Sequence, residues 1–250
     1  MATATKAAGR RKLPGLTVKD GYTPHPFDLE FGVRTSGLVA GRHLKTGHLH
    51  DRHATAYYGV APSVFHSLLK HWQRSKPIAP LEEFTFIDIG AGMGRAVLLA
   101  SQLPFRAVHG VELHPTLTRI ARRNATLWKQ QGRARCPIHI HQGDACSFRF
   151  PAGPCLAFLF NPFGAPVMRQ ILSHIAESFA DRPGELDLLY VNNEQERQIR
   201  MQPGLRRLFL GKVLRSRTDA RADIKILSSQ PDGEYLAEPH EDCSIWRWVG

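Results

Sequence analysis

The chain has 250 residues, 42% of them hydrophobic, which is enough for one α/β domain with additional segments. Its formal net charge of +11 is concentrated in residues 1–20 and in residues 196–225, where nine Lys and Arg face three acidic residues. No stretch is long and apolar enough to cross a bilayer, the N-terminus lacks the apolar core of a signal peptide, and the four cysteines show no C-x-x-C spacing. We therefore expect a cytoplasmic protein with reduced thiols.

The N-terminal quarter of the chain shows little hydrophobic periodicity. Residues 1–20 are small and basic and predict a disordered basic tail. Residues 21–62 contain aromatics and predict an N-terminal cap, partly helix and partly loop, that crosses the mouth of a ligand site. Within it, His48, His50 and His53 stand close together, but cysteine and a further close ligand pair are absent from this stretch. We expect a polar loop here and no metal site.

From residue 63 to the C-terminus, hydrophobic patterns predict alternating helices and strands of one domain. The last two strands are expected to form a hairpin around the turn-prone residues 231–233. The predicted helices are 64–73, 95–103, 116–130, 164–179 and 194–210, and the predicted strands are 84–87, 107–112, 138–141, 156–161, 186–191, 224–228 and 244–249.

A glycine-rich turn follows the first predicted strand. Gly90, Gly92 and Gly94 stand at alternate positions, and Asp88 precedes them by two residues. Glycines permit a tight turn and let a ligand approach bare backbone, and ligands of open α/β sheets bind at such strand–loop–helix corners. The spacing differs from the G-x-G-x-x-G pattern of dinucleotide folds. An acidic side chain beside the turn suits a ligand with an ammonium group better than one with a pyrophosphate.

This segment resembles motif I of the class I S-adenosylmethionine (SAM)-dependent methyltransferases. The resemblance implies SAM as cofactor and an α/β, Rossmann-like fold with a seven-stranded, mostly parallel sheet and an antiparallel terminal strand. It covers about residues 57–250 and is most specific over 84–164. The chain also looks like an uncharacterised group of small bacterial methyltransferases that share the patterns F-D-x-x-x-G-V-x-T and F-N-P-F. That likeness implies a fold and a cofactor but no substrate.

Two further acids follow predicted strands, as in that family. Glu112 can accept two hydrogen bonds from a ribose diol, and the resemblance implies that Asp144 accepts one from the exocyclic amine of adenine. Tyr57-Tyr58 resembles a segment that touches the methionine end of the cofactor in some relatives, although both rings could equally be packing residues. The predicted cofactor-binding residues are Tyr58, Asp88, Gly90, Ala91, Gly92, Gly94, Glu112, Leu113, Asp144, Ala145 and Asn161.

The strand that starts at residue 156 ends in Asn161-Pro162-Phe163, which is similar to the N-P-P-[YF] motif of methyltransferases acting on planar amines. In that family the asparagine amide and a proline carbonyl accept hydrogen bonds from the target nitrogen, and the aromatic ring stacks on it. This chain has one proline instead of two. A second interpretation is structural, with Pro162 ending the strand and Gly164 opening a turn. The predicted catalytic residues are Asn161, Pro162 and Phe163.

These patterns together predict a SAM-dependent methyltransferase with an unidentified small-molecule or protein acceptor, such as an amine nitrogen or a protein lysine. One rival is an NAD-dependent oxidoreductase. Another is a non-catalytic nucleic-acid-binding module on the same fold, which would use the basic residues 197–225. Nucleic acid is not favoured, because only Phe209 interleaves with these basic residues and a solvated basic face accounts for them. The oligomeric state has no signal in the sequence.

Overall fold

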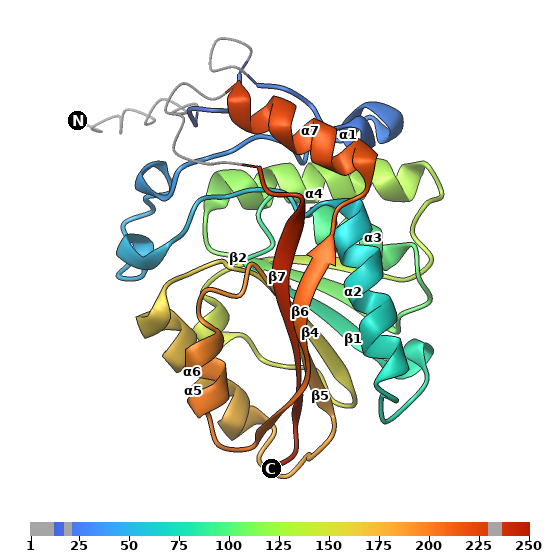
Figure 1. Cartoon of the computed structure of the whole chain (residues 1–250), viewed down its shortest axis with the longest axis vertical. Coiled ribbons are helices and arrows are strands. Elements are labelled where there is room, and N and C mark those ends of the chain that lie inside the picture. Colours follow the sequence, from blue (N-terminus) through green and yellow to red (C-terminus); the bar gives the residue numbers. More distant parts are fainter. Residues whose placement is uncertain (1–12, 18–21, 230–236) are drawn as a thin grey trace, which may run out of the picture.

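The computed structural model describes residues 13–17, 22–229 and 237–250 and places them around one mixed sheet (Figure 1). The seven strands lie in the order β3-β2-β1-β4-β5-β7-β6. Strands β1 to β5 run parallel, and β7 is antiparallel to both of its neighbours. The strands are β1 (Thr85–Ile89), β2 (Ala107–Glu112), β3 (Ile138–Gln142), β4 (Cys155–Phe160), β5 (Leu186–Val191), β6 (Leu205–Leu214) and β7 (His240–Trp248).

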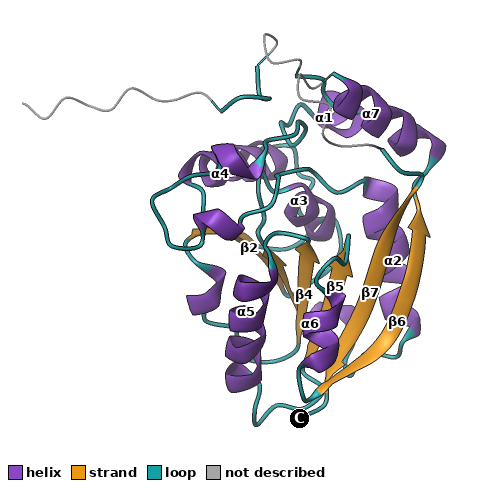
Figure 2. Ribbon diagram, turned by 60° about the vertical axis from the view of Figure 1, so that its left-hand side comes forward, coloured by secondary structure: helices purple, strands orange, loops and turns teal. Residues whose placement is uncertain are grey.

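Helices cover both faces of this sheet (Figure 2). Strand residues alternate between the faces, so Phe86 and Phe158 pack with helices α2 to α4, while Ile87 and Leu159 pack with α5. None of the described helices is long and apolar enough to span a membrane. The α-helices are α1 (Pro26–Phe31), α2 (Pro62–Arg74), α3 (Arg95–Ser101), α4 (Pro115–Gln130), α5 (Ala165–Ser178), α6 (Glu196–Met201) and α7 (Arg217–Ser228).

The predicted fold class is confirmed, including the seven strands and the reversed strand near the C-terminus. The sheet order brings β1 and β4 together at its centre, with β2 on the other side of β1. Parallel strands direct their carboxyl ends to one edge, and the connections that follow the neighbouring strands β1 and β4 leave this edge in opposite directions. Ligands of open α/β sheets bind at such a switch point.

Two predicted elements near the C-terminus are wrong. The expected helix 194–210 is only the short α6, because Pro203 and Gly204 (φ 82°) end it and the chain continues as β6. The expected strand 224–228 is part of α7, so the partner of β7 in the terminal hairpin is β6. The sequence pattern did not predict helix α7, because two acids interrupt its apolar stripe. Asp219 and Asp223 lie on its buried face, beside Ala222 and Ile226.

The N-terminal segment packs on the domain. Val39 pairs with Tyr57, and Ala54 pairs with Phe163 beyond β4. Helix α1 lies beside α7 (Figures 1 and 2), and His25 comes within 3.4 Å of Asp219 there. Most of the predicted tail 1–20 and the turn 231–233 lie outside the described residues, and the described part of the tail packs Leu13 and Leu16 into a cluster with Leu44 and Tyr57.

Candidate cofactor and acceptor sites

The glycine turn after β1 has the left-handed backbone that its sequence predicts. Gly90, Gly92 and Gly94 have φ values of 79°, 54° and 88°, which residues with a Cβ rarely adopt. A Cβ on Gly90 would lie 2.4 Å from the Pro162 side chain, and one on Gly92 would lie 2.1 Å from the Tyr57 ring. These two glycines therefore admit close neighbours from β4 and from the cap. The third, Gly94, faces Ala121 of α4.

A cavity of about 1000 Å³, its open mouth included, lies over this turn. Its walls come from the ends of β1, β2 and β4, from the 143–145 turn and from cap residues 44–60. Most predicted cofactor-binding residues line it, whereas Gly92 and Gly94 lie behind the lining and Asn161 belongs to a second cavity. The predicted residues that line the first cavity are Tyr58, Asp88, Gly90, Ala91, Glu112, Leu113, Asp144 and Ala145, together with Pro162 and Phe163.

Asp88 places a carboxyl group without a partner in this cavity. Only 3% of the residue is exposed, and no described residue donates a hydrogen bond to its carboxyl or pairs with it. Burial raises the pKa of Asp88 well above its usual value, and the neighbouring charge of Glu112 raises it further. An uncompensated buried carboxyl is costly for a protein. A cationic group in the cavity would remove that cost.

Glu112 is also buried, but backbone donors hold its carboxylate. Its Oε2 accepts from the N–H of Gly92 at 2.8 Å, and its Oε1 accepts from the N–H of His114 at 2.7 Å. Burial raises the pKa of Glu112, while these hydrogen bonds oppose the shift. A carboxylate has about four lone-pair sites, so the group can still accept from a diol in the cavity.

The two tyrosines ahead of α2 have separate roles. The ring of Tyr57 lies against Gly92, and its hydroxyl donates to the Thr35 carbonyl at 2.6 Å. Tyr58 lines both cavities, and its hydroxyl donates to Asp223 of α7 at 2.6 Å. Burial raises the pKa of both hydroxyls. Both hydroxyl protons are thus used inside the protein.

A buried ion pair that the sequence analysis missed fastens the cap to the glycine turn. Arg95, the first residue of α3, lies 3.6 Å from Asp28 and donates to Thr35 and Ser36 at 2.7 and 2.8 Å. Asp28 in turn accepts from the N–H groups of Thr35 and Ser36, both at 2.7 Å. Asp28 and Thr35 are the Asp and Thr of the F-D-x-x-x-G-V-x-T pattern. That pattern marked two of the residues around the ion pair in the sequence, but it did not include Arg95.

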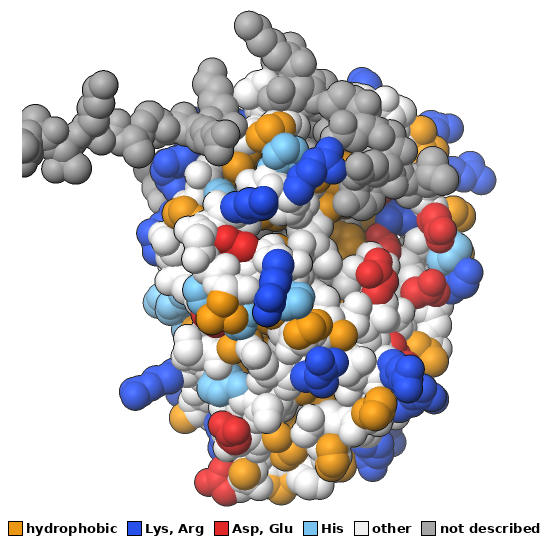
Figure 3. Space-filling model, turned by 90° about the vertical axis from the view of Figure 1, so that its left-hand side faces the viewer, with side chains coloured by type: hydrophobic (Ala, Val, Ile, Leu, Met, Phe, Trp, Pro, Cys, Tyr) orange, Lys and Arg blue, Asp and Glu red, His pale blue; other side chains and the backbone are white. Residues whose placement is uncertain are grey.

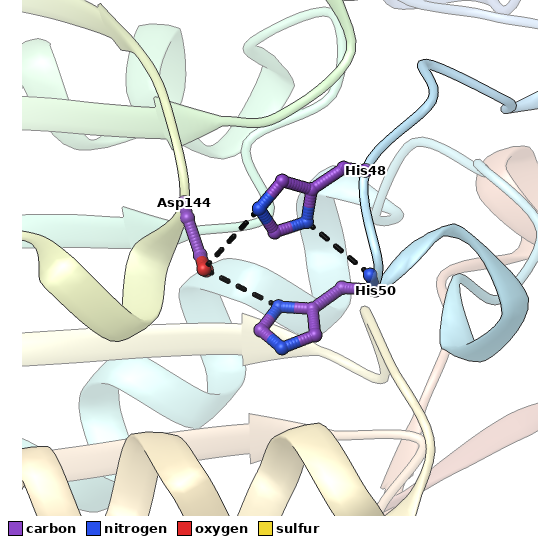
Figure 4. Close-up of side chains that lie close together, drawn as sticks. All are labelled: His48, His50 and Asp144. Carbon is purple, nitrogen blue, oxygen red and sulfur yellow. Dashed lines mark hydrogen bonds and ion pairs between the residues drawn. The ribbon is translucent and has the colours of Figure 1, made fainter.

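Asp144 lies against two histidines of the cap (Figure 4). Its Oδ1 accepts from the Cys146 N–H at 3.0 Å and begins the 3-10 turn Ala145–Ser147. Its Oδ2 lies 3.3 Å from His50 Nδ1 and 3.8 Å from His48 Nε2. Sequence analysis placed these side chains in separate motifs, and only the folded chain brings them together.

The Asn161-Pro162-Phe163 segment forms a strained turn after β4. Asn161 has φ 38°, its Oδ1 accepts from the Tyr190 hydroxyl at 3.1 Å, and its carbonyl accepts from the Thr55 hydroxyl. The Pro162 carbonyl accepts from the Thr55 N–H at 3.3 Å. The two oxygens that the family motif directs at an acceptor nitrogen therefore already hold one hydrogen bond each. The Phe163 ring lines the first cavity.

A second cavity of about 1560 Å³, again with its open mouth, adjoins the first. The two share the wall formed by Ala54, Thr55, Ala56, Tyr58 and Phe160. Acidic side chains dominate the charge of the second cavity. They are Glu194, Glu238, Glu241 and Asp242, and the basic residues in its lining are Arg42 and Arg215.

The predicted basic strip is divided among α6, β6 and α7. Arg200 and Arg207 pair with Glu196 at 3.9 and 3.2 Å, and the buried Arg215 pairs with Asp223 at 2.7 Å. On the face shown in Figure 3, the described Lys and Arg side chains lie mostly apart from one another, among histidine, hydrophobic and uncharged groups. Part of the charge of the strip is thus balanced by acidic partners within the protein.

Comparison with known proteins shows likeness at the level of the fold. No protein-family model and no curated protein matches the chain. A solved structure of the [4+2]-cyclase SpnF is 16% identical, with 74% of this chain and 81% of that chain covered and a TM-score of 0.52. A geranyl diphosphate methyltransferase in complex with SAM is 12% identical, with 75% and 85% covered and a TM-score of 0.49.

An RNA methyltransferase from Salinibacter ruber in complex with S-adenosylhomocysteine is 18% identical, with 74% of this chain and 90% of that chain covered and a TM-score of 0.42. At such identities the likeness shows a fold and not an activity. The strand order and the reversed β7 are those of a Rossmann-like fold of the class I methyltransferase type.

Proposed function

We propose that the chain is a SAM-dependent methyltransferase that binds its methyl donor in the first cavity. The observation that carries this proposal is the unpartnered, buried carboxyl of Asp88 beside the glycine turn. The ammonium group of SAM would pair with it. Glu112 would accept from the ribose hydroxyls, and Asp144, with Ala145 and Leu113 beside it, would border the adenine.

The carboxyl group of Asp88 argues against a dinucleotide. A pyrophosphate at this turn would lie beside this buried group, which would repel it when ionised. An acid at the place of Glu112 does not discriminate, because dinucleotide folds also use one there to bind a ribose. An oxidoreductase using NAD is therefore the weaker proposal.

We propose the second cavity for the methyl acceptor, and an amine as the acceptor group. Glu194, Glu238 and Asp242 would attract a cation, since Arg215 is already paired with Asp223 and Glu241. An ammonium must lose a proton before its nitrogen can attack. Burial raises the pKa of Glu241 to about 7, which suits a group that accepts protons near neutrality.

The sulfonium of SAM supplies an activated methyl group. The chain would align the amine lone pair with the methyl carbon and exclude water. The bond from nitrogen to carbon forms as the bond from carbon to sulfur breaks, and the extra proton of the amine passes to a carboxylate or to solvent. Thr55 and Phe160, in the wall between the cavities, are placed to border the path between donor and acceptor.

Methyl-labelled SAM tests the transfer. The full chain is incubated with fractionated lysate and with a lysine-rich peptide, and the labelled products are separated by their stability to base. We expect base-stable label on nitrogen in the wild type, and a clear loss of label for Glu241→Gln with S-adenosylhomocysteine affinity unchanged. Label that base releases from ester oxygens would contradict the amine, and absence of label from every fraction would contradict the transfer.

A further inference from the structure

Three polar side chains converge at the edge of the first cavity (Figure 4). His48 and His50 come from the cap, and Asp144 begins the turn after β3. Each offers one ligand atom, and these atoms all lie within 4.8 Å of one another. His50 and Asp144 also line the cavity.

One ring nitrogen of this cluster is buried without a hydrogen bond. His50 is only 8% exposed, and its buried Nδ1 has no hydrogen-bond partner although the Asp144 carboxylate is 3.3 Å away. Buried ring nitrogens in proteins almost always have a partner. A ring nitrogen and a carboxylate oxygen at this spacing can both bind one metal ion.

We infer that His48, His50 and Asp144 form a binding site for a divalent transition-metal ion, with zinc as its simplest occupant. Two imidazoles and a carboxylate are ligands that zinc and other first-row metals accept. Around tetrahedral zinc, ligand atoms at about 2.1 Å from the metal lie roughly 3.4 Å apart. The distances of 3.3 and 3.8 Å to Asp144 Oδ2 are close to that spacing. Three protein ligands leave one position open, on the side of the cavity.

Neighbouring backbone groups orient Asp144 and, before an ion binds, His48. The Cys146 N–H holds Asp144 Oδ1 and leaves Oδ2 directed at the histidines. The His50 N–H donates to His48 Nδ1 at 3.2 Å, so the proton of a neutral His48 ring lies on Nε2. An ion at Nε2 moves that proton to Nδ1 and ends this hydrogen bond. A metal binds only the neutral imidazole, so protons compete with the ion for the histidine rings and its affinity falls in acid.

The site shares Asp144 with the proposed adenine end of the cofactor cavity. An ion and a cofactor that contact one carboxylate change each other's affinity by the same factor. Ion binding itself is independent of the proposed function, and the test uses the protein without SAM.

Calorimetry of the full chain tests the site after chelator treatment, with zinc as the titrant at pH 7.5. We expect one ion for each chain, and at least tenfold weaker binding for His50→Ala and for Asp144→Asn. The matched control is His53→Ala, which removes a histidine of the same loop that is not part of the cluster. Cobalt gives a second signal, since its visible absorption reports nitrogen and oxygen ligands and should be lost in His50→Ala. Circular dichroism verifies that each variant is folded.

Two results would overturn the inference. One is stoichiometric zinc that binds His50→Ala as tightly as the wild type, which places the ion elsewhere. The other is the absence of zinc and cobalt binding to the folded wild type, which leaves the three side chains as an ion-paired contact of the cap.

Discussion

Asp88 and Glu112 are two buried carboxyl groups beside one glycine turn, and the protein supports them differently. Backbone N–H groups hold Glu112, whereas Asp88 has no described partner. Perturbed and unpaired acids of this kind cluster at functional sites because they weaken the free protein in exchange for binding. This contrast between the two acids is the residue-level basis of the proposed cofactor site.

The change Asp88→Asn should separate stability from binding. Because the folded pKa of Asp88 is raised, its stabilising contribution is complete below the ordinary Asp pKa, which is 3.8, and is lost as pH rises through the folded value. The variant has no carboxyl group to titrate at this position. Its free energy of unfolding, measured with urea, should therefore rise relative to that of the wild type from about pH 4 upward. Its affinity for S-adenosylhomocysteine should fall about 10- to 100-fold, since a charged hydrogen bond contributes about 1.5–3 kcal/mol. A variant that loses stability and keeps its affinity would contradict both parts.

The sequence contains much of this site at the level of single residues. Asp88 and Glu112 follow apolar strands, so their positions at one edge of the sheet could be derived from pattern and strand order. The contact of Asp144 with His48 and His50 could not, because the cap follows no periodicity that fixes its path. The hydrogen bond from Tyr190 to Asn161 was equally hidden, since it depends on the left-handed backbone at Asn161.

The glycine turn before α3 packs against the Tyr57 ring of the cap. Gly92→Ala should destabilise the protein in two ways, through the left-handed backbone and through a Cβ placed 2.1 Å from the Tyr57 ring. Gly132→Ala is the matched control, because Gly132 also has positive φ (67°) but a Cβ added there would meet nothing within 4 Å. Urea unfolding should show a loss of about 1–2 kcal/mol for the control and a larger loss for Gly92→Ala. Equal losses of unfolding free energy in the two variants would show that the Tyr57 ring moves aside at little cost.

The ion pair between Arg95 and Asp28 joins the cap to α3. Arg95→Met leaves Asp28 without its cation in a buried position, so urea unfolding should show a loss of about 3–5 kcal/mol. Arg123→Met, at an exposed position of α4, should change stability by less than about 0.5 kcal/mol. A small loss for Arg95→Met would mean that hydrogen bonds within the cap, and not the ion pair, hold it in place.

Regular elements could be predicted where their residues show a clear apolar pattern. Strands β1 and β5 are buried throughout and mostly apolar, and α2 and α4 have clear apolar stripes, so their patterns predicted them within a few residues. The sequence patterns did not predict helix α7 and strand β6, because polar residues interrupt the apolar pattern of both. Buried acids paired with Arg215 and Ser63 interrupt the pattern of α7, and the half-exposed edge strand β6 mixes arginines with leucines.

Across the whole molecule, the sheet, the cap and α7 together shape two adjoining cavities. The sheet contributes the acids of the first cavity, while the second draws its acids from the ends of β5 and β7. The fold class could be predicted because six of the seven strands and one glycine turn carry a strong signal. The second cavity could not be predicted, because its lining combines the cap with α7, part of which the sequence patterns assigned to a strand.

Calorimetry of the full chain with S-adenosylhomocysteine and, separately, with NAD decides whether the first cavity holds a methyl donor. We expect that S-adenosylhomocysteine binds with one site for each chain, that NAD shows no heat of binding, and that Asp88→Asn weakens the first interaction. Binding of NAD in place of S-adenosylhomocysteine would contradict the proposed cofactor, as would S-adenosylhomocysteine binding that Asp88→Asn leaves unchanged.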